Sequence, residues 1–205
     1  MEIDPLESAN AAAEELEERR ERDAAARRLG TWVAITVAML ATFLGICKVK
    51  DDNIVQGMQQ AQADRIDQWS FYQARNLREE VAAATAAQLE VAAGGASAGD
   101  QARYRDAIAK YKALAEEQAK KKEELRAQAE QQQKTYDALN YRDDQFDLSD
   151  AAIAVAISLL AVTALTHKRW LFFVAMVPTV IGVVMGLAGL FEWHLHPDAI
   201  VKLLS

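Results

Sequence analysis

Apolar residues are concentrated in three runs along the chain, at residues 31–49, 150–166 and 170–191. The first run is about 19 residues long, close to the ~20 residues with which an α-helix crosses a hydrocarbon core of ~30 Å. Nearly all charged residues lie outside the runs, whereas a soluble globular domain mixes the two kinds at short range. The pattern predicts an all-α membrane protein with three transmembrane helices.

The two C-terminal runs are separated only by His167-Lys168-Arg169, which is too short for anything but a tight turn at a membrane surface. We therefore expect these two spans to form a transmembrane hairpin. Trp32, Trp170 and Trp193 fall at the ends of the predicted spans. Aromatic rings prefer the headgroup region of a bilayer, so their positions agree with the predicted boundaries.

Residues 50–147, between the first and second spans, contain no proline and have one cluster of glycines, at residues 94–99. This pattern predicts a long extramembrane helical hairpin with its turn at 94–99. Its arms are about 43 and 48 residues long, or ~65 and ~70 Å at about 1.5 Å per residue. Because the arms are nearly equal in length, both can return to the same membrane surface.

The second arm has the residue spacing of an antiparallel coiled coil. Alternate steps of four and three residues connect thirteen positions, of which nine are apolar or aromatic. These positions are Tyr104, Ile108, Tyr111, Ala115, Gln118, Lys122, Leu125, Ala129, Gln132, Tyr136, Leu139, Asp143 and Phe146. The first arm is less regular, and we expect its inward face to consist of Ile54, Met58, Ala61, Ile66, Trp69, Tyr72, Leu77, Val81 and Ala84.

Several seam positions are alanine, and Gln118, Lys122 and Gln132 are polar. Each layer of the hairpin therefore buries little apolar area, which stabilises by about 25 cal/mol per Å². We expect a single hairpin to be weakly held, and a homo-oligomer formed through the hairpin and the transmembrane helices to supply the missing burial.

The two ends of the chain predict shorter helices. Residues 1–30 are expected to form a cytoplasmic helix, and residues 192–205 a helix at the membrane interface. Five arginines precede the first span, and Lys168-Arg169 joins the second span to the third. Because positive charge collects on the cytoplasmic side, the N-terminus is predicted inside and the hairpin and C-terminus outside.

Net charge narrows the possible partners. The chain has 23 basic and 30 acidic residues, and the resulting charge of −7 argues against nucleic-acid binding. The single cysteine, Cys47, allows no disulfide within the chain. Ile46 precedes it, whereas a lipoprotein cleavage site has a small residue there, so we expect a plain thiol at the membrane edge.

The residue patterns of known catalytic sites do not occur in the sequence, which has no nucleophile constellation, no glycine-rich phosphate loop and no zinc-ligand spacing. We expect a protein that is not an enzyme and that binds no cofactor or metal. His194 and His196 beside Glu192 form the one arrangement resembling a metal site, but polar residues that end the third span are the favoured interpretation. The predicted spans also lack the buried charges that pumps and transporters use.

Two groups of residues are candidates for helix contacts or partner binding. Gly182 and Gly186, extended by Gly189, have the spacing that lets another transmembrane helix approach closely, although ordinary glycines in a membrane helix explain them equally well. Trp69, Tyr72 and Gln73 form the other group. Packing between the two arms is the favoured interpretation of this group, and a docking site for a partner is the alternative.

The segment Asp67-Gln68-Trp69-Ser70-Phe71-Tyr72-Gln73-Ala74-Arg75 resembles the Trp-x-x-Tyr-Gln-Ala-(Lys/Arg) signature of a bacterial membrane family known as domain of unknown function 4337. Phe146-Asp147-Leu148 and Arg169-Trp170-Leu171 add to the resemblance, which extends from the first span onward. It implies a location in the bacterial inner membrane but no activity, because the family has none assigned.

Three functions remain as hypotheses. A non-enzymatic, self-associating membrane scaffold is the favoured one. An accessory subunit of a larger membrane complex is the alternative. An oligomeric channel is disfavoured because the predicted spans lack polar pore-lining residues.

Overall fold

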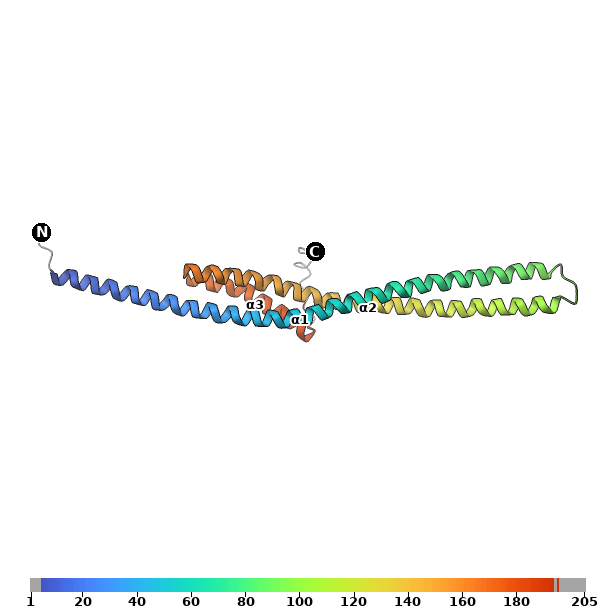
Figure 1. Cartoon of the computed structure of the whole chain (residues 1–205), viewed down its shortest axis with the longest axis horizontal. Coiled ribbons are helices and arrows are strands. Elements are labelled where there is room, and N and C mark those ends of the chain that lie inside the picture. The colour runs from blue at the N-terminus through green and yellow to red at the C-terminus, as the bar shows by residue number, and fades with distance from the viewer. Residues whose placement is uncertain (1–4, 194, 196–205) are drawn as a thin grey trace. The chain divides into compact units, whose positions relative to one another are not determined.

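The chain forms three α-helices in the computed structural model, which describes residues 5–193 and 195, with backbone only for residues 5–13. They are α1 (Pro5–Ala93), α2 (Gln101–Thr166) and α3 (Arg169–Phe191) (Figure 1). The described part of the chain contains no strand. The predicted all-α class is therefore confirmed.

Each of the first two helices is continuous through segments that the sequence predicts as separate elements. The predicted N-terminal helix, first span and first arm belong to the single helix α1, and the second arm and second span belong to α2. Neither helix has a proline in its interior, and proline is the residue that most strongly interrupts a helix. The break between α1 and α2 falls on the glycine-rich segment 94–99.

The helices pack in two units. The three-helix unit contains residues 1–53 and 141–205, and the hairpin unit contains residues 54–140. Residues 1–4, 194 and 196–205 lie outside the described residues, and with them most of the predicted C-terminal helix 192–205.

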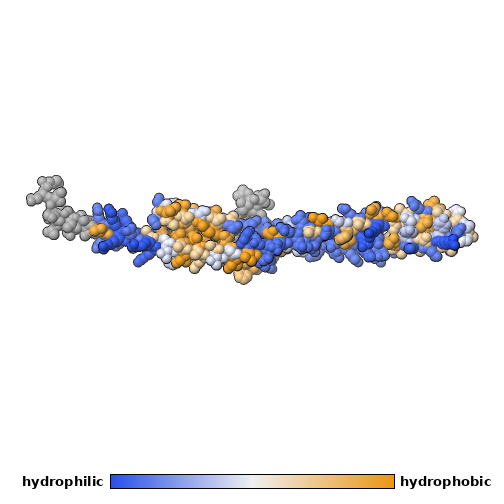
Figure 2. Space-filling model, viewed as in Figure 1, coloured by the Kyte–Doolittle hydropathy of each residue, from blue (hydrophilic) through white to orange (hydrophobic). Residues whose placement is uncertain are grey.

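The three-helix unit has an apolar core and an apolar exterior. Its core contains the buried residues Val33, Leu40, Ile153, Ala156, Leu160 and Ala175. Large apolar side chains such as Met39, Val177 and Val180 are more than half exposed on its outside. Figure 2 shows apolar residues gathered over this part of the chain. All three helices are long and apolar enough to cross a membrane, as the sequence predicts.

In the hairpin unit the two arms run side by side and antiparallel (Figure 1). The predicted seam of the second arm is accurate, because all eleven of its positions from Tyr104 to Leu139 are buried or half-buried. Ile54, Met58 and Ala61 of the first arm are buried too, as expected.

Beyond Ala61 the predicted inward face of the first arm is right only at Tyr72 and is otherwise wrong. Ile66, Leu77 and Val81 are 54%, 62% and 58% exposed, and Trp69 and Ala84 are also exposed. The observed seam keeps the alternate steps of four and three residues that the second arm uses. Its buried or half-buried members are Ile54, Met58, Ala61, Arg65, Gln68, Tyr72, Arg75, Glu79, Ala82, Ala86, Leu89 and Ala93. Polar residues thus occupy the middle of the seam, and an apolar stripe lies outside it.

Candidate interaction surfaces

The three glycines of α3 lie where helices of the three-helix unit approach most closely. A Cβ atom on Gly182 would lie 2.6 Å from Ile153 of α2, and one on Gly189 would lie 2.8 Å from the ring of Phe146. All three glycines are buried. They therefore pack against helices of the same chain, and their role in contacts between chains stays a prediction.

Ser149 fixes the same contact with a hydrogen bond. Its hydroxyl donates to the Gly182 carbonyl at 2.8 Å, and the side chain is fully buried. A Cβ atom on Gly186 would lie 2.7 Å from the Ser149 hydroxyl oxygen. The contact thus combines small residues with a satisfied polar group, as transmembrane helix interfaces commonly do.

The end of α3 is held to α2 by two polar side chains. Arg142 donates to the Gly189 carbonyl at 3.1 Å and pairs with Glu192 at 2.8 Å. Gln145 is buried and donates to the carbonyls of Trp193 and Leu195 at 2.8 and 2.7 Å. These bonds satisfy backbone acceptors in the last turn of α3 and just after it. The hydrophobic periodicity of the sequence does not predict the contacts of either residue.

Acidic side chains of α1 and α2 meet beside this contact, just outside the predicted spans. Asp51 is buried, accepts a hydrogen bond from Lys48 at 2.8 Å and lies near the Asp143 carboxyl. Burial, the interaction with Asp51 and the negative charge of Asp147 together raise the pKa of Asp143 to about 7. Burial and the charge of Asp51 also raise the pKa of Asp147. A protonated Asp143 can donate to Asp51, which keeps the pair free of repulsion.

Polar side chains of the two arms interact with each other across the seam of the hairpin unit. Arg75 donates to the Gln118 side-chain oxygen at 2.8 Å. Lys122 donates to Asn76 at 3.1 Å and lies 2.6 Å from the Glu79 carboxylate. Arg75 and Lys122 are therefore paired with polar residues of the other arm, and these pairs favour one register of the two arms.

The predicted group of Trp69, Tyr72 and Gln73 is only partly in this seam. The rings of Trp69 and Tyr72 meet edge to face, with centroids 5.2 Å apart. Tyr72 is half-buried, with the Lys122 ammonium 6.0 Å from its ring centroid. Trp69 is 38% exposed and Gln73 is exposed. One side of the group packs between the arms, and the other side faces outward.

An apolar groove lies along the outside of the hairpin unit. Its apolar lining is formed by Leu77, Val81 and Ala82 of α1 and by Tyr111 and Leu114 of α2, and its volume is about 390 Å³. The exposed side chains of Leu77 and Val81 belong to the face that the apolar pattern placed inside the hairpin.

The described residues contain no group of three or more His, Cys, Asp or Glu side chains that could hold a metal ion. His194 and His196 lie outside them, so the arrangement near Glu192 is not placed by the structure.

A comparison with protein families gives one match, to the family called domain of unknown function (DUF4337), over residues 29–192. The chain belongs to this family. The DUF4337 region begins just before the first predicted span and ends at the cap of α3, so it includes both arms of the hairpin and all three spans. No match was found among curated proteins, and none among solved structures.

The DUF4337 signature residues lie in both units. Trp69, Tyr72 and Arg75 follow one another along the first arm, and Tyr72 and Arg75 point into its seam. Phe146 is buried against Gly189, and Arg169 begins α3. Among the residues of the family resemblance, Tyr72, Arg75 and Phe146 therefore lie in contacts between helices, whereas Trp69 and Arg169 are exposed.

Proposed function

We propose that this protein is a non-enzymatic, self-associating scaffold of the bacterial inner membrane. Its three-helix unit crosses the bilayer with the N-terminus in the cytoplasm. The hairpin unit forms an antiparallel coiled coil outside the membrane and binds the hairpin of a second copy.

The outward apolar stripe of the first arm is the observation that best supports this proposal. Ile66, Leu77 and Val81 are each more than half exposed, and Val91 is 83% exposed. Exposed apolar patches of this kind mark interaction sites in soluble regions of proteins. Covering them contributes about 25 cal/mol for each Å² of apolar surface removed from water.

The spacing of the stripe favours another helix as its cover. The apolar residues Ile66, Leu77, Val81, Ala84 and Val91 follow one another at steps of eleven, four, three and seven residues. Steps built from three, four and seven residues place side chains on one side of a helix, as the heptad repeat does in helices that pack together. The first arm therefore has two such faces, one covered by the second arm and one uncovered.

A second copy of the same hairpin is a suitable neighbour because it presents the same stripe and the same groove. In a two-fold dimer each copy would insert Leu77 and Val81 beside Leu114 of the other. The polar layer around Lys122 is already paired within one hairpin, so it remains satisfied when copies associate. Association of two copies therefore needs only the burial of apolar side chains and breaks no polar pair within a hairpin.

Cysteine cross-linking in native membranes tests the proposal. A Val81→Cys variant in a Cys47→Ser background should form a disulfide-linked dimer on mild oxidation, because Val81 lies in the predicted contact. Ala83→Cys in the same background is the matched control. Ala83 is exposed two residues further along, roughly 200° around the helix at about 100° per residue.

Preferential dimer formation at position 81 supports self-association through the stripe. Equal or absent cross-linking at both positions overturns it. A Val81→Cys product that contains a different protein in place of a second copy would instead support an accessory subunit.

A further inference from the structure

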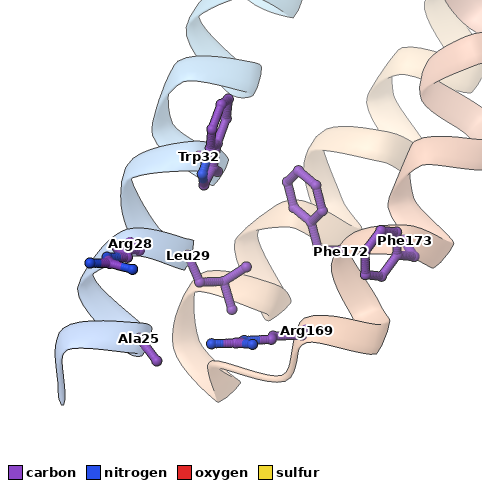
Figure 3. A pocket seen from close by; sticks show the side chains of 7 residues that line it. All are labelled: Ala25, Arg28, Leu29, Trp32, Arg169, Phe172 and Phe173. Carbon is purple, nitrogen blue, oxygen red and sulfur yellow. The ribbon is translucent and has the colours of Figure 1, made fainter. Parts of the chain in front are cut away.

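A second groove lies between α1 and the beginning of α3, within the three-helix unit (Figure 3). Its volume is about 320 Å³. Leu29 and Trp32 of α1 and Phe172 and Phe173 of α3 line it, together with Arg28 and Arg169. The groove is thus mainly apolar, with one cationic side chain on each of its two helices.

Neither arginine has an acidic partner among residues 5–193 and 195. Arg28 and Arg169 are exposed, and neither forms an ion pair with any residue that the structure describes. In Figure 3 the guanidinium of Arg169 extends from the start of α3 toward α1, at the level of Ala25. Two unpaired guanidinium groups beside one groove are suited to a phosphate, which accepts paired hydrogen bonds from the planar guanidinium.

The apolar part of the groove leads into the predicted spans. Leu29 is buried, and Trp32 and Phe173 are 63% and 70% exposed. Trp32 and Phe172 are the second and third residues, respectively, of the predicted spans 31–49 and 170–191. Aromatic side chains at this level lie at the boundary between headgroups and acyl chains. A ligand of the groove would therefore place its charge near the arginines and its apolar part along the aromatic rings.

We propose that this groove binds an anionic phospholipid, with the phosphate between Arg28 and Arg169 and an acyl chain against Trp32 and Phe172. The inference goes beyond self-association and rests only on the proposed membrane placement. The lipid joins α1 to α3 at the end of the unit opposite to the Gly189 contact, because residue 169 begins α3 and residue 189 lies in its last turn.

Native mass spectrometry of the full-length protein in mild detergent tests the proposal. The delipidated protein is titrated with phosphatidylglycerol and with phosphatidylcholine that has the same acyl chains. Phosphatidylglycerol should bind more tightly. The Arg28→Gln/Arg169→Gln variant should weaken its binding by about tenfold or more, since charge-assisted hydrogen bonds are lost.

Arg27→Gln/Lys168→Gln is the matched control. Both residues are exposed neighbours of the groove arginines, and neither lines the groove. This variant removes the same charge and should retain binding within about twofold. An equal loss in both double variants would show a general attraction of anionic lipid to positive charge, and it would overturn the proposal.

Filling the groove gives a second, independent readout. Ala25 lines the groove and is half-buried, so Ala25→Phe should occupy its apolar part while both arginines remain. Lipid binding should fall by about tenfold with no change in charge. Unchanged binding would contradict an acyl chain in the groove.

Two further titrations separate the lipid from other occupants. If inorganic phosphate or glycerophosphoglycerol displaces the lipid at micromolar concentration, the groove is a site for a free anion. If the Ala25→Phe variant changes the oligomer mass but not lipid binding, a second copy occupies the groove. Either result overturns the proposal. Recovery of the wild-type chain from cells without detergent would instead refute the membrane placement itself.

Discussion

The ring of Phe43 on α1 lies 2.7 Å from the position that a Cβ atom on Gly186 of α3 would occupy. A methyl group there must displace the ring or separate the helices, and overpacking of this kind costs about 1–3 kcal/mol. We predict that Gly186→Ala lowers the free energy of unfolding of the three-helix unit by this amount. Thermal unfolding of the detergent-solubilised protein measures the change.

Gly45→Ala is the control for that substitution. Gly45 lies on α1 within the first predicted span, and a Cβ atom there meets nothing within 4 Å. The added methyl group should be neutral or slightly stabilising, because alanine favours a helix more than glycine does. If the two variants unfold at the same temperature, the close contact of α1 with α3 is not present.

The ion pair between Lys122 and Glu79 should stabilise the hairpin unit more than pairs on its surface do. Both side chains are mostly buried, at 16% and 27% exposure. Lys122→Ala leaves the carboxylate without its charged partner and should destabilise the hairpin unit more than the loss of an exposed pair does. Hydrogen exchange of the backbone amides around Glu79 and Lys122 should accelerate accordingly.

Arg126→Ala provides the comparison for Lys122→Ala. Arg126 pairs with Glu130 of the same helix at 3.0 Å, and both side chains are more than half exposed. Its loss should change the stability of the hairpin unit much less than the loss of Lys122 does, because water screens the exposed pair. Equal acceleration of exchange in the two variants would mean that the polar layer does not stabilise the seam.

The stability of the three-helix unit should fall as pH rises from about 4 to about 7. The pKa of Asp143 is raised to about 7 in the folded protein, so the folded state holds this proton over a range in which the unfolded chain releases it. The stabilisation is fully present below the ordinary pKa of an aspartic acid, near 3.9. It is lost as pH approaches the folded-state value.

Asp143→Asn should remove this part of the pH dependence, because the amide is neutral and can still donate to Asp51. The variant should unfold at a higher temperature than the wild type at pH 8 and at a similar temperature at pH 4. Asp137→Asn, at an exposed position of the hairpin unit, should leave the pH dependence unchanged. A parallel pH profile for Asp143→Asn and the wild type would contradict the shared proton.

The proposed topology places the turn of the hairpin outside the cell. Ser97 lies in this turn and is exposed. In a Cys47→Ser background, Ser97→Cys should react with a membrane-impermeant thiol reagent on intact cells, once the outer membrane is permeable to the reagent. Reaction only after lysis would place the hairpin in the cytoplasm and reverse the orientation.

Hydrophobic periodicity predicts the inward face of the second arm well and that of the first arm poorly, for a physical reason. On the second arm Ile108, Leu125 and Leu139 lie on one side only, so apolar spacing identifies the seam. The first arm has apolar residues on two sides, and hydropathy favours the side with Leu77 and Val81. The true seam contains charged residues, whose burial becomes favourable only through partners on the other arm.

The sequence predicts a close helix contact at the glycines of α3, but it does not predict which helix makes that contact. The spacing of Gly182 and Gly186 indicates that some helix approaches closely, yet it contains no information on which helix does so. That choice depends on side chains such as Ile153 and Phe43, which fill the space over each glycine. The hydrogen bond from Arg142 to the end of α3 could not be predicted from the sequence. Its acceptor is a backbone carbonyl, and every residue has one.

The mass of the protein after extraction in mild detergent tests self-association most directly. The full-length chain at native concentration should have the mass of two or more copies. Leu77→Gln/Val81→Gln should shift it toward one copy, because both side chains lie in the uncovered stripe. Leu125→Gln, in the seam within one hairpin, should instead lower stability. A wild-type protein with the mass of a single chain would contradict the proposed scaffold.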